Sequence, residues 1–345
     1  MTTPAPPRIL SGVQPSGKLH LGNYFGAIKQ HIALQDRGPS FYFIADYHAL
    51  TTIGDLESDV RKRAGVLRDN VRDVALSYLA LGLDPAKAAL FRQSDVPEVT
   101  ELQWILATVT GMGLLERAHS YKDKVAHGLT PSVGLFTYPV LMAADILIYR
   151  SNLVPVGKDQ VQHLEMTRDM AGSFNAAFGQ AIFPEPRELL DVAAVVPGTD
   201  GKDADGNFRK MSKSYGNTID IFAEGKALKD TVMRRIVTDS SKVEDPKDPT
   251  KCSVFALYSL FASEEEKADM AAKYRAGGMG YGTAKTALLQ KIDAYFAPAR
   301  AKRKELEARP DEVEDVLRNG AKRARAEAQA TMDLVRAATG LGRRP

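Results

Sequence analysis

The sequence contains a single cysteine, Cys252, among its 345 residues. One cysteine excludes an intramolecular disulfide and any metal site built from several cysteines, and it is typical of proteins in a reducing compartment. Long apolar runs are also missing, because the most apolar stretch, Tyr138–Tyr149, is short and contains Asp145. Met1–Arg8 carries prolines where a secretory signal peptide needs an apolar core. We therefore expect a cytoplasmic protein that does not enter a membrane.

Neither sign of charge is in large excess, since 46 Lys and Arg residues stand against 43 Asp and Glu residues and leave a net charge of +3. This balance permits binding to a polyanion without predicting it. The 44% of hydrophobic and 26% of charged residues are close to the average of globular proteins, which argues against a disordered or fibrous chain. The length suffices for one large domain and one smaller domain.

The first half of the chain alternates short apolar runs with helical periodicity. The runs Arg8–Ser11, Ser40–Ala45 and Ala88–Phe91 predict buried parallel strands. Between the second and third runs, one helical face predicts a crossover helix that ends before Gly82. Its members are Val60, Ala64, Leu67, Val71, Val74, Tyr78 and Leu81. This order predicts an α/β fold with a doubly wound, Rossmann-like parallel sheet that binds ligands at the carboxyl ends of its strands.

In the second half, helical periodicity replaces the strand pattern from about residue 226 onward. It covers Leu228–Val237, Val254–Phe261 and Thr283–Tyr295, and it returns in Val313–Ala338. These segments predict a smaller, all-helical C-terminal domain.

A glycine-bearing loop, Gln14-Pro-Ser-Gly-Lys-Leu-His-Leu-Gly-Asn23, follows the first expected strand and leads into a helical pattern. Gly17 and Gly22 allow the backbone to approach a base or a phosphate, and a helix N-terminus offers free N–H groups to negative charge. His20 and Asn23 can contact phosphate and ribose. An ordinary turn before a helix uses the same residue types, so this motif alone only favours a nucleotide site.

A second motif, Lys210-Met-Ser-Lys-Ser214, places two lysines three residues apart with small hydroxyl side chains beside them. On a mobile loop, two ammonium groups can stabilise a triphosphate whose charge shifts during nucleotidyl transfer. The alternative is a solvated surface turn. The presence of both motifs in one chain favours the enzymatic interpretation.

Together the motifs resemble the HIGH and KMSKS signatures of class I aminoacyl-tRNA synthetases, with His20-Leu-Gly-Asn23 as the first. Further segments resemble bacterial tryptophanyl-tRNA synthetases in order and spacing over essentially the whole chain. They are Ser11–Gly17, Thr137–Leu147, Val154–Gln160 and the closing Gly340-Leu-Gly-Arg-Arg344. The resemblance implies a homodimer that activates L-tryptophan with Mg-ATP to tryptophanyl-adenylate and pyrophosphate. The amino acid then passes to the 3′ end of tRNA(Trp).

The resemblance also implies the ATP site. It is formed by the glycine-bearing loop, by a second loop at Gly157–Asp159 and by the lysine motif. Its expected residues are Gln14, Pro15, Ser16, Gly22, Asn23, Gly157, Lys158, Asp159, Val195, Lys210, Met211, Ser212, Lys213 and Ser214. The catalytic residues implied are Lys210, Lys213, His20 and Lys122, with Mg²⁺ bound to ATP and no structural metal. Lys158 stands where many relatives have an acidic residue, and its role stays open.

An indole ring has one N–H donor and no acceptor, so a selective tryptophan pocket must offer an acceptor. Asp145 lies in an apolar helical stretch and, by resemblance, accepts this N–H. A buried aspartate can also bridge two structural elements. By the same resemblance Met142 forms the floor of the indole slot, Tyr138 and Gln160 hold the ammonium group, and His48 lies near the substrate.

The resemblance divides the chain into three parts. Residues 1–220 form the catalytic domain, residues 221–300 bind the tRNA anticodon, and residues 301–345 form a C-terminal helix that packs back toward the catalytic domain. Lys322, Arg323 and Arg325 on this helix form either a solvated face or a tRNA contact. We expect Thr199–Arg209 to be a solvated loop, because no suitably spaced glutamate completes a calcium site.

Three other functions are alternatives to the one that the resemblance implies. A tyrosyl-tRNA synthetase shares the fold, but the Met142–Asp145 segment and the C-terminal ending argue against it. A small nucleotidylyltransferase needs neither this length nor the helical second half. A synthetase-like protein that binds tRNA or a regulatory partner without catalysis is excluded only by an assay.

Overall fold

The computed structural model describes residues 6–118, 121–122, 132–157, 160–190, 195–203 and 205–342. The chain divides into two compact units. The first, here called the sheet unit, comprises Met1–Gly17, Gln30–Asp191 and Leu306–Pro345. The second, here called the helical unit, comprises Lys18–Lys29 and Val192–Glu305. Each unit is therefore built from segments that are far apart in the sequence.

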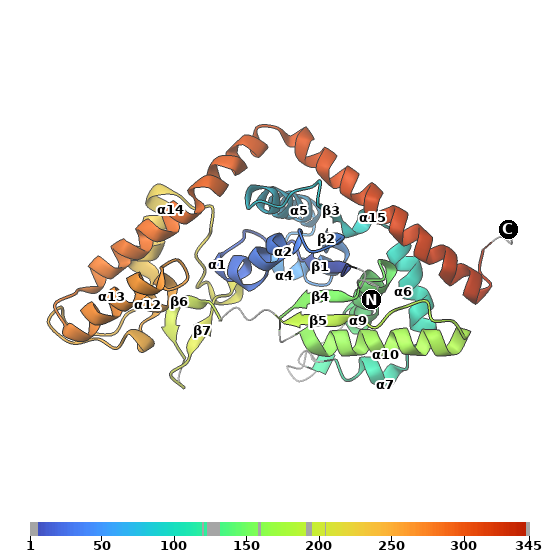
Figure 1. The fold of residues 1–345 in the computed structure, drawn as a ribbon, viewed down its shortest axis with the longest axis horizontal. Coiled ribbons are helices and arrows are strands. Elements are labelled where there is room, and N and C mark those ends of the chain that lie inside the picture. Colours follow the sequence, from blue (N-terminus) through green and yellow to red (C-terminus); the bar gives the residue numbers. More distant parts are fainter. Residues whose placement is uncertain are drawn as a thin grey trace, which may run out of the picture. The chain divides into compact units, whose positions relative to one another are not determined.

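The sheet unit contains a five-stranded parallel sheet in the order β3-β2-β1-β4-β5, which runs from top to bottom in Figure 1. The strands are β1 (Ile9–Val13), β2 (Ser40–Ile44), β3 (Ala88–Arg92), β4 (Leu153–Val156) and β5 (Arg187–Leu190). The chain builds outward from β1 on one side and then returns to its other side with β4, which is a doubly wound order. The predicted α/β fold and its first three strands are confirmed. The strands β4 and β5 were not predicted, because each has only four residues and β5 is partly exposed.

Helices connect and flank these strands. They are α2 (Lys29–Leu34), α3 (Asp46–Ala49), α4 (Ile53–Leu56), α5 (Arg63–Ala80), α6 (Glu98–Val109), α7 (Met112–Leu115), α9 (Val133–Ile148), α10 (Val161–Phe178) and α15 (Pro310–Thr339), with a 3₁₀ turn η2 (Gln93–Asp95). The predicted crossover helix is confirmed as α5, but its expected start at Val60 is wrong. Val60 is 68% exposed and lies before the helix, where the Asp59 carboxylate accepts a hydrogen bond from the backbone N–H of Arg61 and stabilises a turn.

Helix α15 covers the edge strand β3. Gly320 makes this possible, since a Cβ atom at that position would lie 1.9 Å from the backbone oxygen of Leu90. Small side chains at Ala324 and Ala328 are fully buried and join the main apolar core. An exposed edge strand is a site of unwanted strand pairing, so this helix also protects the sheet.

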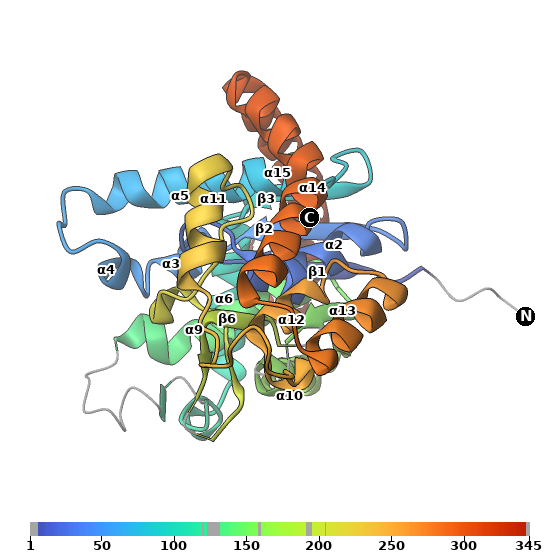
Figure 2. The ribbon, with the colours of Figure 1, turned by 90° about the vertical axis from the view of Figure 1, so that its left-hand side faces the viewer.

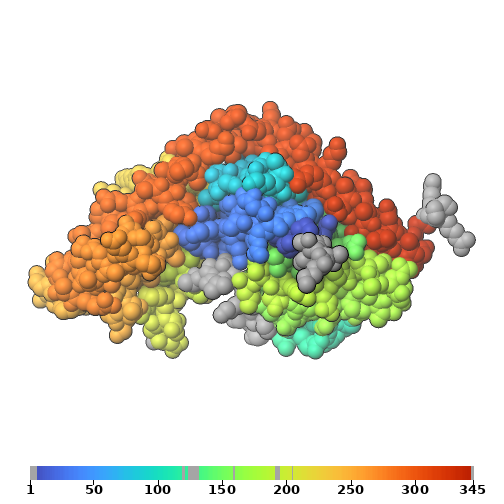
Figure 3. Space-filling view, in the orientation of Figure 1, coloured from blue at the N-terminus to red at the C-terminus, as the bar shows by residue number. Residues whose placement is uncertain are grey.

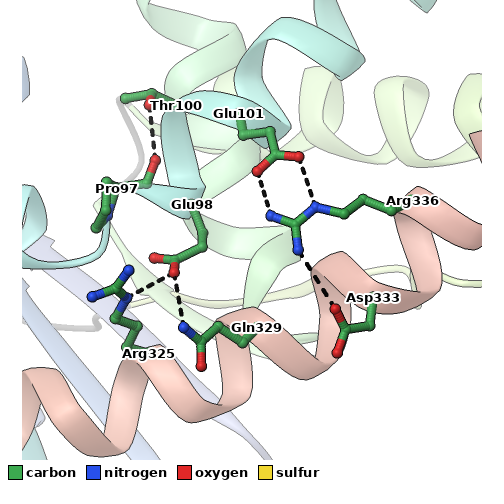
Figure 4. Close-up of polar contacts among 8 residues, drawn as sticks. All are labelled: Pro97, Glu98, Thr100, Glu101, Arg325, Gln329, Asp333 and Arg336. Atoms are coloured by element: carbon green, nitrogen blue, oxygen red, sulfur yellow. Dashed lines mark hydrogen bonds and ion pairs between the residues drawn. The ribbon is translucent and has the colours of Figure 1, made fainter. Parts of the chain in front are cut away.

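Polar contacts on the flank of α15 add to this docking. The Arg336 guanidinium donates two hydrogen bonds to the Glu101 carboxylate of α6, at 2.8 and 2.5 Å, and Arg325 pairs with Glu98 at 2.7 Å (Figure 4). Arg323 donates to the backbone oxygen of Pro85 at 2.7 Å. Of the three cations singled out in the sequence, Arg323 and Arg325 thus contact the sheet unit itself. The outer side of α15, coloured red in Figure 3, is uncovered and includes the exposed Lys322.

The helical unit contains a two-stranded antiparallel hairpin and a set of short and long helices. They are β6 (Pro197–Lys202), β7 (Phe208–Lys210), α1 (Leu21–Asn23), η1 (Tyr24–Ile28), η4 (Lys213–Tyr215), α11 (Gly225–Asp230), η5 (Thr231–Arg235), η6 (Pro249–Lys251), α12 (Ser253–Tyr258), α13 (Glu264–Ala276) and α14 (Tyr281–Glu307, whose last two residues belong to the sheet unit). The hairpin β6–β7, α12 and α13 lie side by side in Figures 1 and 2. The predicted all-helical second half is largely confirmed, and α13 was missed because its surface is highly polar.

The expectation of a solvated loop at Thr199–Arg209 is wrong. These residues form most of the hairpin β6–β7, whose strands pair through Lys202 and Phe208. Asp203 closes the turn, because its carboxylate accepts hydrogen bonds from the backbone N–H groups of Asp205 and Asn207. Asp203 therefore serves as a turn residue.

An aromatic cluster explains why Lys18–Lys29 belongs to the helical unit. Tyr24 and Phe25 meet Phe261, Tyr295 and Phe296 in edge-to-face contacts with ring centroids 5.1–5.9 Å apart for the Tyr24–Tyr295, Tyr24–Phe296 and Phe25–Phe261 pairs. The hydroxyl groups of Tyr24 and Tyr295 are 2.9 Å apart and share a hydrogen bond. Such aromatic pairs each contribute about 0.5–1.5 kcal/mol beyond the burial of their area. The helix after the first motif is thus fixed to α14.

We expect Gly320→Ala to destabilise the protein, because the added methyl group forces α15 away from the backbone of β3. Overpacking of this kind costs about 1–3 kcal/mol or more. The matched control is Gly172→Ala in the exposed middle of α10, where nothing lies within 4 Å of the added Cβ. That change should stabilise by about 0.5–1 kcal/mol. Urea unfolding of both variants tests the prediction, and equal midpoints would contradict it.

Candidate active site

The glycine-bearing loop begins where the sheet changes direction. Gln14, Pro15 and Ser16 follow β1, and Gly157 follows β4, the strand paired with β1 on its other side. Ligands of doubly wound sheets bind at the carboxyl ends of the strands at this switch point. The structure therefore brings these four expected ATP residues to one edge of the sheet. Lys158 and Asp159 lie outside the described residues.

Asp145 is buried in α9, with 1% of its surface exposed, and it is held by side chains from two other elements. The Nε2 atom of His48, in α3 after β2, lies 2.9 Å from one carboxylate oxygen. The amide nitrogen of Gln93, directly after β3, lies 2.9 Å from both oxygens. Burial raises the pKa of Asp145, while the hydrogen bonds from His48 and Gln93 act in the opposite direction. A carboxylate that is so placed is an acceptor fixed at the carboxyl edge of the sheet.

Gln93 was not predicted from the sequence. Its side-chain oxygen accepts a hydrogen bond from the backbone N–H of Tyr47 at 3.1 Å, so its amide donors are directed toward Asp145. Nothing in the sequence marks it, because its importance depends on its burial and on the partners of its side chain in the fold. A buried glutamine must be hydrogen-bonded, and here its partners are residues of the candidate site.

Tyr138 and Gln160 are connected through a second residue that was not predicted, His163 in α10. The Tyr138 hydroxyl is hydrogen-bonded to Nε2 of His163, and Nδ1 of His163 lies 3.1 Å from the side-chain oxygen of Gln160. The rings of Tyr138 and His48 meet edge to face at 6.2 Å, which joins this chain of contacts to the Asp145 group. Met142, half-buried, lies one turn before Asp145 on α9.

In the helical unit the first motif is hydrogen-bonded to the segment that follows the lysine motif. Leu19–Leu21 pairs with Ile219–Ile221, through bonds from Leu21 N to Ile219 O at 3.0 Å and from Ile221 N to Leu19 O at 3.3 Å. A Cβ atom on Gly22 would lie 3.3 Å from the backbone oxygen of Met211 and 3.0 Å from the His20 ring. A glycine at this position therefore lets the lysine motif lie close to the first motif. Asn23 completes the turn, since its side-chain oxygen accepts from the backbone N–H of His20 at 3.1 Å.

His20 is the residue whose electrostatics connect the motifs. Burial, Lys213 and Lys210, in that order, lower the pKa of His20 to about 4. The imidazole is thus neutral at pH 7 and adds no positive charge to the two ammonium groups. Its Nδ1 atom is buried and has no hydrogen-bond partner among the described residues. A neutral ring can donate or accept a hydrogen bond toward a ligand.

The lysine motif itself combines one anchor with exposed polar groups. Met211 is 2% exposed, and its backbone N–H donates to Val196 O at 2.9 Å, whereas Lys210 and Ser214 are exposed and Ser212 and Lys213 are half-buried. Val195, next to this anchor, is 62% exposed. Lys122, in the sheet unit, is exposed, and its backbone N–H donates to Ala118 O at 3.2 Å.

The chain is similar to known proteins over most of its length. A model of the family described as tRNA synthetases class I (W and Y) matches residues 2–297. The chain is 58% identical over 334 residues to a tryptophan–tRNA ligase of Rhodopirellula baltica, covering 97% of this chain and 99% of that protein. It is 54% identical to the tryptophan–tRNA ligase of Fusobacterium nucleatum, covering 92% and 93%. A crystal structure of tryptophanyl-tRNA synthetase from Campylobacter jejuni, complexed with ADP and tryptophan, is similar with a TM-score of 0.86 and 48% identity, covering 97% of this chain and 100% of that one.

We expect Lys213→Gln to raise the pKa of His20 above its value of about 4, because one of the two charges that lower it is removed. His31 is an internal control, since burial alone lowers its pKa to about 4 and its Nδ1 atom bonds the Tyr78 hydroxyl within the sheet unit. NMR titration of the imidazole C–H signals, assigned with His20→Gln and His31→Gln variants, measures both. An unchanged His20 titration would mean that the charge of Lys213 does not contribute to the pKa of His20.

Proposed function

Because the chain belongs to the class I tRNA synthetases of the W and Y group, and within it acts as a ligase for tryptophan, we propose residue roles for that reaction. The resemblance drawn from the sequence is confirmed by the family match over residues 2–297. The family model covers enzymes for both amino acids, but the relatives at 58% and 54% identity are ligases for tryptophan. The match also extends over the helical second half, which a small nucleotidylyltransferase lacks.

The reaction has two steps. The carboxylate of tryptophan attacks the α-phosphorus of ATP, forming tryptophanyl-adenylate while pyrophosphate leaves. The terminal ribose hydroxyl of the tRNA then attacks the activated carbonyl carbon, and AMP leaves. Since the attacking carboxylate is already ionised, no protein nucleophile is needed, and orientation and positive charge supply the rate enhancement.

We propose that Lys210 and Lys213 are the catalytic residues that stabilise the negative charge of the departing pyrophosphate. The effect of both lysines on the pKa of His20 supports this role, because it means that their charges reach one point of the helical unit. His20, neutral at pH 7, bonds a phosphate oxygen in this proposal, and Lys122 approaches the phosphates. Mg²⁺ binds together with ATP, on the phosphate oxygens.

The remaining ATP contacts come from both motifs and from the second loop. Their proposed members are Gln14, Pro15, Ser16, Gly22, Asn23, Gly157, Lys158, Asp159, Val195, Met211, Ser212 and Ser214. The position of Gln14, Pro15, Ser16 and Gly157 at the switch point of the sheet supports the first part of this set.

We propose that Asp145 reads the indole N–H of tryptophan. Its carboxylate is buried and already held by His48 and Gln93, so it stays fixed when the substrate binds. A carboxylate has about four lone-pair sites, which leaves room for a further donor. Tyr138 and Gln160, connected through His163, hold the ammonium group, and Met142 forms the floor of the indole slot.

The assembly and location of the protein are also proposals. We propose a cytoplasmic homodimer whose residues 1–220 carry catalysis, whose residues 221–300 bind the anticodon of tRNA(Trp), and whose residues 301–345 support the catalytic part. Trp104 on α6 and Met112 on α7 expose 72% and 62% of their surfaces and offer apolar area to a second copy. Among the described residues, no helix has both the length and the hydropathy that crossing a membrane requires.

The function is tested by exchange of labelled pyrophosphate into ATP with tryptophan, with tyrosine and with no amino acid. We expect exchange with tryptophan only, because a fixed indole-reading acceptor and a slot for a fused ring pair select this side chain. Exchange with tyrosine would mean that the protein is a tyrosyl-tRNA synthetase. No exchange with either amino acid would support a non-catalytic tRNA-binding or regulatory protein.

The role of Asp145 is tested with a tryptophan analogue in which sulfur replaces the indole N–H. The wild-type protein should lose about 100-fold in kcat/KM for this analogue, because a buried acceptor is left without its donor. For Asp145→Ala, we expect kcat/KM for tryptophan to fall by a similar factor from the wild-type value. Its kcat/KM for the analogue should be little lower than its kcat/KM for tryptophan. Equal discrimination by both proteins would remove Asp145 as the reader of the N–H group. Asp205→Ala, in the exposed turn of the hairpin β6–β7, is the control.

A further inference from the structure

Asn217 follows the lysine motif by three residues, and its side chain is almost completely buried, with 1% of its surface exposed. Its amide uses both of its functions on neighbouring groups. The side-chain oxygen accepts from the backbone N–H of Ser212 at 2.7 Å. The side-chain nitrogen donates to the backbone oxygen of Lys210 at 3.1 Å and to the carboxylate of Asp200 at 2.7 Å.

The surroundings are shaped for this amide. A Cβ atom on Gly198 would lie 2.0 Å from the side-chain nitrogen of Asn217, so only glycine leaves room for it. The backbone of Asn217 is fixed as well, because its oxygen accepts from Thr199 N at 3.0 Å. Asp200, which receives the amide, also pairs with Arg209 at 3.3 Å. The hairpin β6–β7 thus presents a socket into which Asn217 fits.

We propose that Asn217 is a positioning residue that fixes the backbone of the lysine motif and thereby directs the ammonium groups of Lys210 and Lys213. Its two contacts with the motif lie on the carbonyl group of Lys210 and on the N–H group of Ser212, the residue before Lys213. They hold the peptide segment that connects the two lysine residues. This proposal rests on the catalytic role proposed above for the two lysines.

An asparagine suits this position better than its charged isostere. The amide supplies one acceptor and two donors, and the three contacts require this combination. An aspartate of the same shape retains the acceptor for Ser212, but it has no donor for Lys210 O and places a second carboxylate against Asp200. Asn217→Asp therefore breaks two contacts without changing the volume of the side chain.

The first test is the tryptophan-dependent pyrophosphate exchange of Asn217→Asp. We expect kcat to fall about 10- to 100-fold, since a displacement of catalytic groups by about 1 Å can have this effect. The KM for tryptophan should stay within about twofold, because the change is confined to the helical unit. Asn207→Asp is the matched control. It makes the same change on the hairpin that forms the socket, where the exposed Asn207 contributes only backbone contacts to the described turn.

A second variant displaces the Asn217 amide without introducing a polar side chain. Gly198→Ala pushes the Asn217 amide out of its socket, and it should lower kcat in the same way. It adds no charge, so a rise in the pKa of His20 from about 4 would report directly that the lysines have moved away from it. A purely structural role would leave this titration unchanged. If Asn217→Asp does not fold, as judged by circular dichroism and thermal unfolding, Gly198→Ala decides the question.

Lys213→Ala separates this inference from the function on which it rests. If the wild-type protein exchanges pyrophosphate and Lys213→Ala is impaired, the catalytic role of the lysine holds. In that case, wild-type kcat in both Asn217→Asp and Gly198→Ala would overturn the inference. If Lys213→Ala is as active as the wild type, the proposed role of the lysine fails. Adding Asn217→Asp to Lys213→Ala should cost less than it does in the wild type, because one of the groups it positions is already gone.

Discussion

The pairing of Leu19–Leu21 with Ile219–Ile221 is the contact on which the chemistry of the helical unit depends. It joins the first motif to the segment that follows the lysine motif, and so brings together two motifs that are about two hundred residues apart in the chain. Gly22 admits the backbone of Met211, while His20 is buried close enough to Lys210 and Lys213 to lose its charge at neutral pH. The site can therefore concentrate two positive charges for a polyphosphate without a third that would repel them. The edge-to-face contacts of Tyr24 with Tyr295 and Phe296 of α14, and of Phe25 with Phe261, fix the helix that follows the first motif.

The sheet unit stabilises a charge of the opposite sign, because it holds the carboxylate of Asp145 in the apolar helix α9. Burial of Asp145 is unfavourable by itself, and hydrogen bonds from His48 and Gln93 compensate for lost water. These partners follow β2 and β3, so the rigidity of adjacent parallel strands is transmitted to the carboxylate. A structural bridge and a ligand-reading acceptor are thus not exclusive alternatives for this residue. The bridge fixes the direction in which the remaining acceptor capacity points.

The sequence predicted the parts of the fold whose apolar pattern is local and strong. The strands β1, β2 and β3 are short, mostly apolar runs, and the helix α5 is completely buried from Val74 to Ala80. Prediction failed where the stabilising partner is distant. The strand β5 is short and partly exposed, and it is recognised only through its pairing with β4. Thr199–Arg209 was misjudged although its turn is local, because the hydrogen bonds that Asp203 accepts from Asp205 and Asn207 cannot be read from composition. The candidate site shows the same division. Residues within motifs, such as His20 and Lys210, could be named from the sequence because chemistry and spacing mark them. Gln93, His163 and Asn217 could not, since their importance lies in which side chains or backbone groups they hold in place.

The helix α15 illustrates how composition can conceal a packing role. Its cations suggested a solvated or tRNA-binding surface, yet Arg325 and Arg336 pair with Glu98 and Glu101 of α6. The Glu101 pKa is lowered by the hydrogen bond from Arg336, so the ionised pair is favoured at neutral pH. Surface ion pairs contribute little stability, whereas the close approach of Gly320 to β3 and the burial of Ala324 and Ala328 require a unique register. The small residues therefore set the register in which α15 lies against the strand, and the charged pairs form on its flank in that register.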